Sequence, residues 1–171
     1  MSGRDVVIGF QDESSPQTTA NTVRVWSDGR PIAVKNAERM RSNVFGLYAM
    51  NGRSVSSFPD GSKAEDMCAF LDEVRAANGD RHVLMALDNA PTHRSAMVAG
   101  HAASLGISLL FLPPYSPQLN PIEQVWRAAK RAVSTRLVLH RDHLVGIIRE
   151  SFEAEVAKDT YFGAWKAKFL P

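Results

Sequence analysis

Three acidic residues stand where predicted strands end or a predicted helix begins. Asp12 follows an apolar run that starts at Val6, and Asp88 follows a second apolar run at residues 82–87. Glu123 comes soon after a third run, at the expected start of a helix. Carboxylates that converge repel one another unless a cation neutralises them, and the hard ions Mg²⁺ and Mn²⁺ prefer oxygen ligands. These positions therefore indicate a divalent-metal site.

A site of this kind suits phosphoryl transfer. Two divalent ions about 4 Å apart would clamp the attacking and leaving oxygens of an in-line displacement, which is the chemistry of a nuclease or strand transferase. Plainer interpretations stay open. Glu123 stands three residues after Asn120 and would also complete a capping box, and the polar residues that follow the first strand are common in turns.

Strands are expected in six short apolar or alternating segments that are bounded by turn residues. They are residues 6–10, 22–26, 43–50, 54–58, 82–87 and 107–112. The last two are expected to be buried. Asn51 and Gly52 are typical of a two-residue hairpin turn between the third and fourth segments. The basic stretch 31–42 is expected to be a loop.

Helices are expected where apolar residues recur at helical spacing. They cover about residues 63–77, 93–105, 121 onward and 141–157, and an aromatic tail at 161–171 is expected to dock. Asn120 is the expected N-cap of the third helix, with Pro121 at its first position. A meander followed by strand–helix crossovers predicts an α/β domain with a mixed sheet and helices on its faces. In such a sheet Asp12 and Asp88 emerge at one carboxyl edge.

The bulk composition fits one globular domain of 171 residues. Charged residues make up 22% and hydrophobic residues 44%, and the net charge of +2 permits contact with nucleic acid without requiring it. The single cysteine, Cys68, excludes an internal disulfide or a cysteine-based zinc site and is expected in the core. Because the sequence has no membrane-length apolar run and no signal peptide at Met1, we expect a cytoplasmic protein.

Three blocks of sequence carry a family resemblance. They are GFQDE at 9–13, LDNAPTH at 87–93 and LPPYSPQLNPIEQVW at 112–126, and 34 residues separate Asp88 from Glu123. In these blocks and this spacing the chain resembles the catalytic domain of bacterial insertion-sequence transposases of the mariner superfamily. Residues 43–53 also resemble the central hairpin of that family, so the resemblance covers nearly the whole chain.

The resemblance implies an RNase H-like α/β fold, in which a mixed five-stranded sheet, an antiparallel meander plus parallel strands, is flanked by helices. It implies that Asp12, Asp88 and Glu123 form an Asp-Asp-Glu (DDE) triad that binds Mg²⁺ or Mn²⁺, with two ions expected. The implied partner is DNA, at transposon ends and at TA target sites, bound by a homodimer or higher assembly in a prokaryotic host.

Seven further residues are candidates for contact with DNA or with the acidic ligands. They are Asn89, His93, Tyr115, Asn120, Arg127, Lys130 and Arg131. Each also has an ordinary explanation as a turn residue, a cap, a packed ring or a solvated helix face. Glu13 follows Asp12 on the same strand and is expected to point to the opposite face.

Family members usually carry an N-terminal helix-turn-helix region that recognises the transposon ends. The first strand here begins close to Met1, so residues 1–171 are expected to form a single catalytic domain without that region. Two alternatives to a transposase stay open. One is an RNase H-like nuclease that cuts without joining, and the other is an inactive or accessory remnant of a split transposase that binds DNA or a partner chain.

Overall fold

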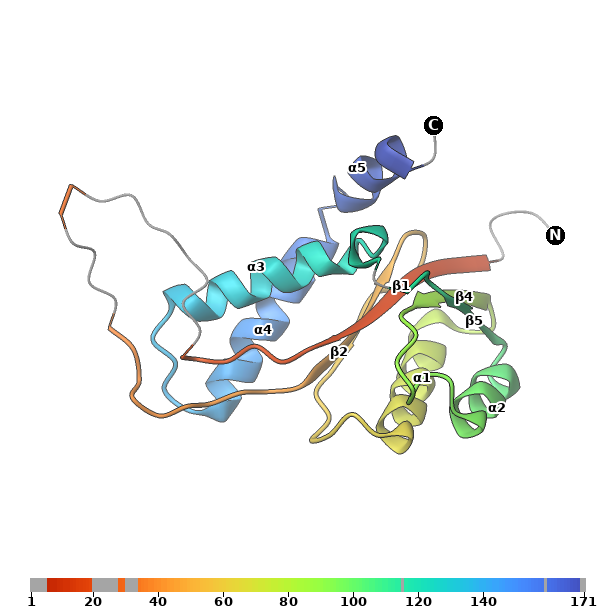
Figure 1. Cartoon of the computed structure of the whole chain (residues 1–171), viewed down its shortest axis with the longest axis horizontal. Helices are drawn as coiled ribbons and strands as arrows, with labels where there is room; N and C mark the ends of the chain where they lie inside the picture. Colours follow the sequence, from red (N-terminus) through yellow and green to blue (C-terminus); the bar gives the residue numbers. More distant parts are fainter. Residues whose placement is uncertain (1–5, 20–27, 30–33, 115, 159, 170–171) are drawn as a thin grey trace.

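A mixed sheet of five strands forms the centre of the molecule (Figure 1). The computed structural model describes residues 6–19, 28–29, 34–114, 116–158 and 160–169. The strands are β1 (Val6–Ser14), β2 (Val44–Ala49), β3 (Val55–Ser57), β4 (His82–Leu87) and β5 (Ile107–Phe111), in the order β3-β2-β1-β4-β5. Antiparallel pairing joins β1 to β2 and β2 to β3, whereas β1, β4 and β5 run parallel. The predicted mixed sheet is confirmed, and the predicted strand at 22–26 lies outside the described residues.

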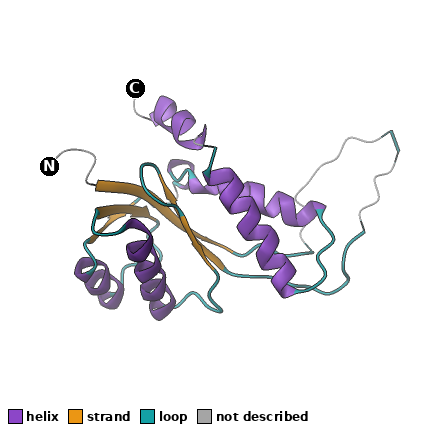
Figure 2. Ribbon diagram, turned by 180° about the vertical axis from the view of Figure 1, so that it is seen from behind, coloured by secondary structure: helices purple, strands orange, loops and turns teal. Residues whose placement is uncertain are grey.

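Helices cover both faces of the sheet (Figure 2). They are α1 (Ala64–Asn78), α2 (Ala96–Ser104), α3 (Ile122–Thr135), α4 (Arg141–Val156) and α5 (Thr160–Phe169), with a short 3-10 helix η1 (Pro117–Leu119) before α3. The pair α1 and α2 packs on one face, and the pair α3 and α4 packs on the other. Within the described residues, no helix combines the length and apolar character needed to cross a membrane.

The central strands are apolar because both of their faces are covered. Phe45 and Leu47 of β2 join the core beneath α1, whereas Val44 and Tyr48 join the core beneath α3 and α4. Successive side chains of a strand point to opposite faces, so a strand between two helix layers loses the usual apolar–polar alternation. Cys68 of α1 is partly buried against the first core, as expected.

The register of the parallel strands places the two predicted aspartates at the same edge of the sheet. Phe10 of β1 pairs with Ala86 of β4. Asp12 comes two residues after Phe10 in the chain, and Asp88 comes two residues after Ala86. Both aspartates therefore reach the carboxyl edge of the sheet at the same height. This is the juxtaposition that the order of the strands predicted.

A glycine lets α3 approach the sheet closely. Gly46 of β2 lies opposite Asp12 of β1. A Cβ atom at Gly46 would stand 2.6 Å from the Trp126 ring, which is a steric clash. Trp126 lies one helical turn beyond Glu123, so the missing side chain at Gly46 sets the height of the acidic end of α3 above β1.

Two predictions, one about the burial of a strand and one about a turn, are wrong. Strand β5 was expected to be buried, but it forms an edge of the sheet, with Leu110 52% and Phe111 38% exposed. The prediction of a two-residue turn at Asn51 and Gly52 is also wrong. The connection between β2 and β3 spans residues 50–54, and Gly52 lacks the positive φ that a type I′ turn requires. Instead, the Asn51 side chain accepts a hydrogen bond from the Ile8 amide, a tertiary contact that the local sequence does not reveal.

Candidate active site

A hollow at the carboxyl edge of the sheet brings the three predicted acids together. Asp12, Asp88 and Glu123 all line it, and its volume is about 400 Å³. The rest of its described wall comes from the loop after β4 and from the proline-rich segment before α3. No lysine or arginine lies among the described residues that line this hollow.

Asp12 experiences the strongest electrostatic effect in this hollow. Burial, together with the negative charges of Glu123 and Asp88, raises the pKa of Asp12 to about 7, although a hydrogen bond from the Glu13 backbone opposes the change. Asp12 is therefore close enough to both other carboxylates to be repelled by them. Such a set is costly without protons or a bound cation.

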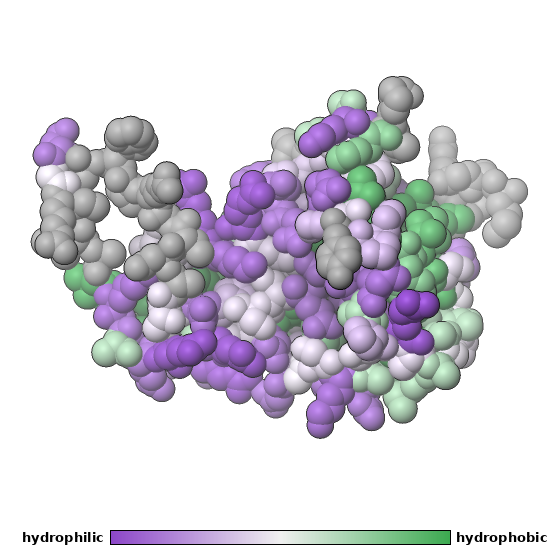
Figure 3. Space-filling view, in the orientation of Figure 1, coloured by the Kyte–Doolittle hydropathy of each residue, from purple (hydrophilic) through white to green (hydrophobic). Residues whose placement is uncertain are grey.

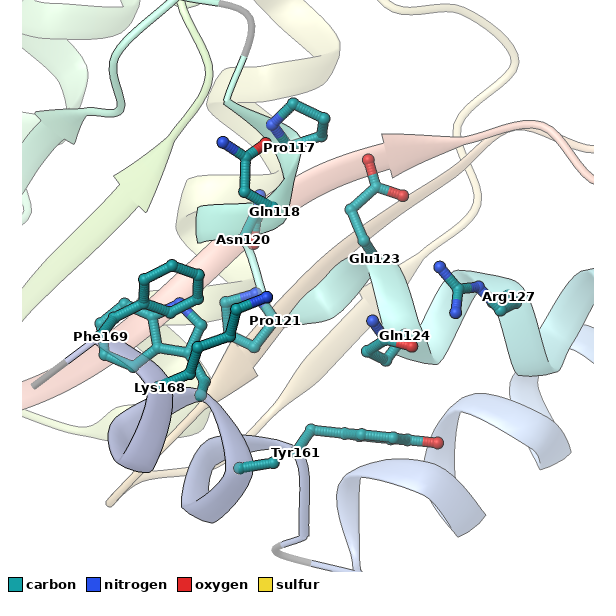
Figure 4. A pocket seen from close by; sticks show the side chains of 12 residues that line it. Pro117, Gln118, Asn120, Pro121, Glu123, Gln124, Arg127, Tyr161, Lys168 and Phe169 are labelled. Carbon is teal, nitrogen blue, oxygen red and sulfur yellow. The ribbon is translucent and has the colours of Figure 1, made fainter.

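The start of α3 presents Glu123 without using it as a cap. The predicted capping role of Asn120 is wrong, because its Nδ2 donates to the Gln11 carbonyl at 3.0 Å and α3 begins at Ile122. This bond ties the start of α3 to strand β1. The Glu123 carboxylate has no hydrogen-bond partner within the described residues and projects from the first turn (Figure 4). Helix capping therefore does not explain Glu123.

A buried histidine holds the second aspartate. His93 Nδ1 lies 2.8 Å from Asp88 Oδ1, and its Nε2 lies 3.2 Å from Glu13 Oε1, with the side chain only 2% exposed. Burial lowers the pKa of His93, but its hydrogen bonds to Glu13 and Asp88 and their negative charges outweigh burial, so the net change is upward. The Ala90 amide also donates to Asp88 at 3.0 Å. Asp88 is thus fixed from two sides.

Helix α2 starts later than the sequence predicts. It begins at Ala96, and the Ser95 side chain accepts a hydrogen bond from the Val98 amide as its N-cap. His93 therefore lies in the turn before the helix, where its ring reaches both acids. Glu13 bonds His93 and does not line the acidic hollow, which agrees with the expectation that it points away from Asp12.

The other predicted candidates lie in different places. Asn89 lines the hollow and donates to the Leu112 carbonyl, which joins the loops after β4 and β5. Arg127 lines a neighbouring groove, whereas Lys130 and Arg131 are exposed farther along α3 and line neither space. Tyr115 lies outside the described residues.

Sequence reasoning missed the groove beside the acidic hollow. It lies between the start of α3 and helix α5, and it includes Tyr161, Trp165, Lys168 and Phe169 (Figure 4). The aromatic tail was expected to dock, and Trp165 does so: its Nε1 donates to the Leu119 carbonyl at 2.9 Å and its ring meets Phe10 edge-on. The spacing of aromatic residues in the tail was the available signal.

Comparison with known families identifies this architecture. The family model described as DDE superfamily endonuclease matches residues 7–145. The chain belongs to this family. A relative from Sinorhizobium fredii, the uncharacterized protein y4pE/y4sA, is 34% identical over 83 residues, which cover 47% of this chain and 59% of that protein.

Solved structures of other proteins share this fold. The Mos1 strand transfer complex superposes with a TM-score of 0.67 at 18% identity, covering 96% of this chain and 51% of the Mos1 chain. The Mos1 transposase catalytic domain with raltegravir and Mn gives 0.66 at 17% identity, with coverage of 96% and 77%. A simian T-cell lymphotropic virus intasome gives 0.55 at 14% identity, with coverage of 82% and 46%. The RNase H-like fold is confirmed, and the chain spans about half the length of the full Mos1 chains.

DDE endonucleases generally use divalent metals, and the donor set here suits such an ion. The acidic hollow offers three carboxylates, two of which repel Asp12, and its described lining holds no lysine or arginine. As this structure stands, no three His, Cys, Asp or Glu side chains of the described residues are grouped closely enough to hold a metal ion. Oxygen ligands favour Mg²⁺ or Mn²⁺ over softer metals.

Proposed function

We propose that this DDE endonuclease-family chain is the catalytic domain of a mariner-superfamily transposase from a bacterial insertion sequence. The proposal rests above all on one observation: Asp12, Asp88 and Glu123 come from three separate elements to one hollow at the sheet edge. Residues 1–171 form a single catalytic domain in this proposal. It acts on DNA as a homodimer or higher assembly.

Each acidic residue has a proposed role as a ligand. Asp12, Asp88 and Glu123 would hold Mg²⁺ or Mn²⁺, which supplies Lewis-acid activation and charge neutralisation for phosphoryl transfer when bound. The chain's own groups set the positions of the ligands. His93 orients Asp88, Asn120 fastens the start of α3 to β1, and Gly46 lets α3 lie low enough for Glu123 to reach the hollow.

Metal-dependent cleavage of supercoiled plasmid DNA tests the enzymatic part of the proposal. The parent protein should nick plasmid with Mn²⁺, and Asp88→Asn and Glu123→Gln should each lower the rate by about a hundredfold or more, because charge stabilisation by bound metal is lost. Circular dichroism should show that both variants keep the fold. Cleavage by both variants at the parent rate would refute the catalytic role of the triad.

A joining assay separates a transposase from a nuclease that only cuts. A short duplex with a free 3′ hydroxyl is incubated with plasmid, Mn²⁺ and the parent protein. Covalent attachment of the labelled strand is the expected result. Cutting without joining, across several duplex sequences, would favour the nuclease. Loss of both reactions in the parent would favour the inactive or accessory remnant.

A further inference from the structure

The groove between α3 and α5 is continuous with the acidic hollow. Both spaces are lined by Pro117, Asn120 and Glu123. A DNA strand with one phosphate at the carboxylates would therefore continue into the groove. The groove has a volume of about 680 Å³, which is within the range of sites for ligands the size of a nucleotide. Its far wall is helix α5.

The two walls of this groove carry unpaired positive charge. Arg127 projects from α3 and Lys168 from α5, and neither has a hydrogen bond or an ion pair with another described residue. Both side chains are exposed. The acidic hollow, by contrast, has no basic residue in its described lining. This change of sign over a short distance suits a phosphate chain that leaves a metal-binding site.

The same groove offers an aromatic surface beside its cations. Tyr161 and Phe169 line it, and Lys168 Nζ lies 5.2 Å above the centre of the Phe169 ring. Hydrophilic and hydrophobic residues lie side by side over α5 (Figure 3). Aromatic rings next to basic groups are the elements with which proteins bind unpaired nucleotides, because bases stack on the rings while cations contact phosphates.

Two aromatic side chains of α5 are held by contacts with other parts of the chain. Trp165 is anchored to Leu119 and Phe10, and the Tyr161 hydroxyl donates to the Glu155 carboxylate. Burial and Glu155 raise the pKa of Tyr161 to about 12, so this phenol stays protonated and uncharged at neutral pH. A wall held in place loses less conformational entropy on binding than a mobile tail would.

We infer that the α3–α5 groove binds unpaired nucleotides of the DNA strand that flanks the scissile phosphate. Arg127 and Lys168 contact its phosphates, and Phe169 and Tyr161 stack on its bases. The inference rests on the proposed action on DNA but concerns a different set of residues. It makes α5 part of the substrate site.

Binding of a fluorescent duplex with and without a six-thymidine 3′ overhang tests this groove. The measurement is made in EDTA, so it requires neither metal nor cleavage. The parent should bind the overhang duplex more tightly than the blunt one. Phe169→Ala should weaken overhang binding about tenfold, as expected for loss of one stacked base, and Lys168→Ala should also lower the salt dependence. Blunt-duplex binding should change little.

Lys166→Ala is the matched control, because Lys166 is exposed on the same helix but does not line the groove. It should keep the preference for the overhang. Iodouracil in the overhang should cross-link to α5 residues under ultraviolet light. The inference would be overturned if the parent showed the same overhang preference as Phe169→Ala, Lys168→Ala and Lys166→Ala. It would also be overturned if cross-links formed only outside α5.

The outcome is separable from that of the proposed function. An overhang preference lost in the groove variants alone supports the groove even if the parent never cleaves plasmid. Metal-dependent cleavage without any overhang preference supports the catalytic site and refutes the groove.

Discussion

At the scale of single residues, Asp12 carries the clearest electrostatic consequence of the site. Its pKa of about 7 means that the folded protein keeps a proton which the unfolded chain releases near pH 4. Without metal, the free energy of unfolding should therefore fall as pH rises from about 4 to about 7, by at most about 4 kcal/mol. Asp12→Asn should remove this decline.

Urea denaturation in EDTA at several pH values checks the prediction for Asp12. The exposed residue Asp80 gives the control variant Asp80→Asn, which should keep the decline of the parent. If the parent and Asp12→Asn showed the same pH dependence, Asp12 would not lie in the repelling environment described above.

His93 should stabilise the fold through its bonds to Asp88 and Glu13. His93→Ala should lower the free energy of unfolding by about 1–3 kcal/mol, because it leaves polar groups without partners. The pKa of His93 is raised above 6.5 in the folded state, so the contribution of its charge is complete below about pH 6.5 and is lost as pH rises through the folded pKa.

Thermal denaturation of His93→Ala across this pH range is the relevant measurement. His101 pairs with Asp72 at 2.9 Å on the surface, so His101→Ala is the matched control and should cost no more than about 1 kcal/mol. A cost for His93→Ala as small as that of His101→Ala would show that the buried bridge contributes little.

At the scale of elements, the close contact of α3 with β2 should be sensitive to volume. Gly46→Ala would push a methyl group into the Trp126 ring and should destabilise the fold by about 1–3 kcal/mol. It should also lower cleavage activity, because α3 carries Glu123. Urea denaturation and plasmid nicking measure the two effects.

Gly100 provides the control for this substitution. It lies within α2, and a Cβ atom added there would have nothing within 4 Å, so Gly100→Ala should stabilise the helix by up to about 1 kcal/mol. Equal stability changes in Gly46→Ala and Gly100→Ala would show that α3 does not need the close approach.

The sequence predicts elements well where one local pattern determines them. Residues 82–87 form β4 as expected, since an apolar run this short between turn residues is too short for a helix. Features that depend on distant partners were not predictable. Asn120 has the ideal type for a cap, but its amide bonds Gln11, which is 109 residues away in the chain.

The exposure of β5 and the α3–α5 groove escaped prediction for a related reason. An apolar run is the same whether its strand lies in the middle of a sheet or at its edge, and only the order of the strands decides between them. Likewise, the aromatic spacing of the tail predicts a docked segment but not the helix against which it packs. The meeting of Asp12, Asp88 and Glu123 at one hollow was predictable, because the expected sheet brings both aspartates to its carboxyl edge and the next helix begins beside that edge.

At the scale of the whole molecule, the residues that stabilise the fold lie apart from the proposed acidic site. Two apolar cores hold the helices on opposite faces of the sheet, while the acids gather at its carboxyl edge. Removing one acid should therefore leave the fold intact. Glu123→Gln should unfold at a temperature equal to or above that of the parent at neutral pH in EDTA, because it relieves repulsion with Asp12. A clearly lower unfolding temperature would mean that Glu123 has a structural role.

Titration calorimetry of Mn²⁺ into the protein, with and without a short DNA duplex, addresses the metal site itself. The parent should bind Mn²⁺ at neutral pH, and Asp88→Asn should lose that binding while its circular dichroism spectrum stays unchanged. Binding should be tighter with DNA, since phosphate oxygens complete the ligands of such ions. Equal Mn²⁺ binding by the parent and Asp88→Asn, or no binding by the parent even with DNA, would contradict a metal site built from Asp12, Asp88 and Glu123.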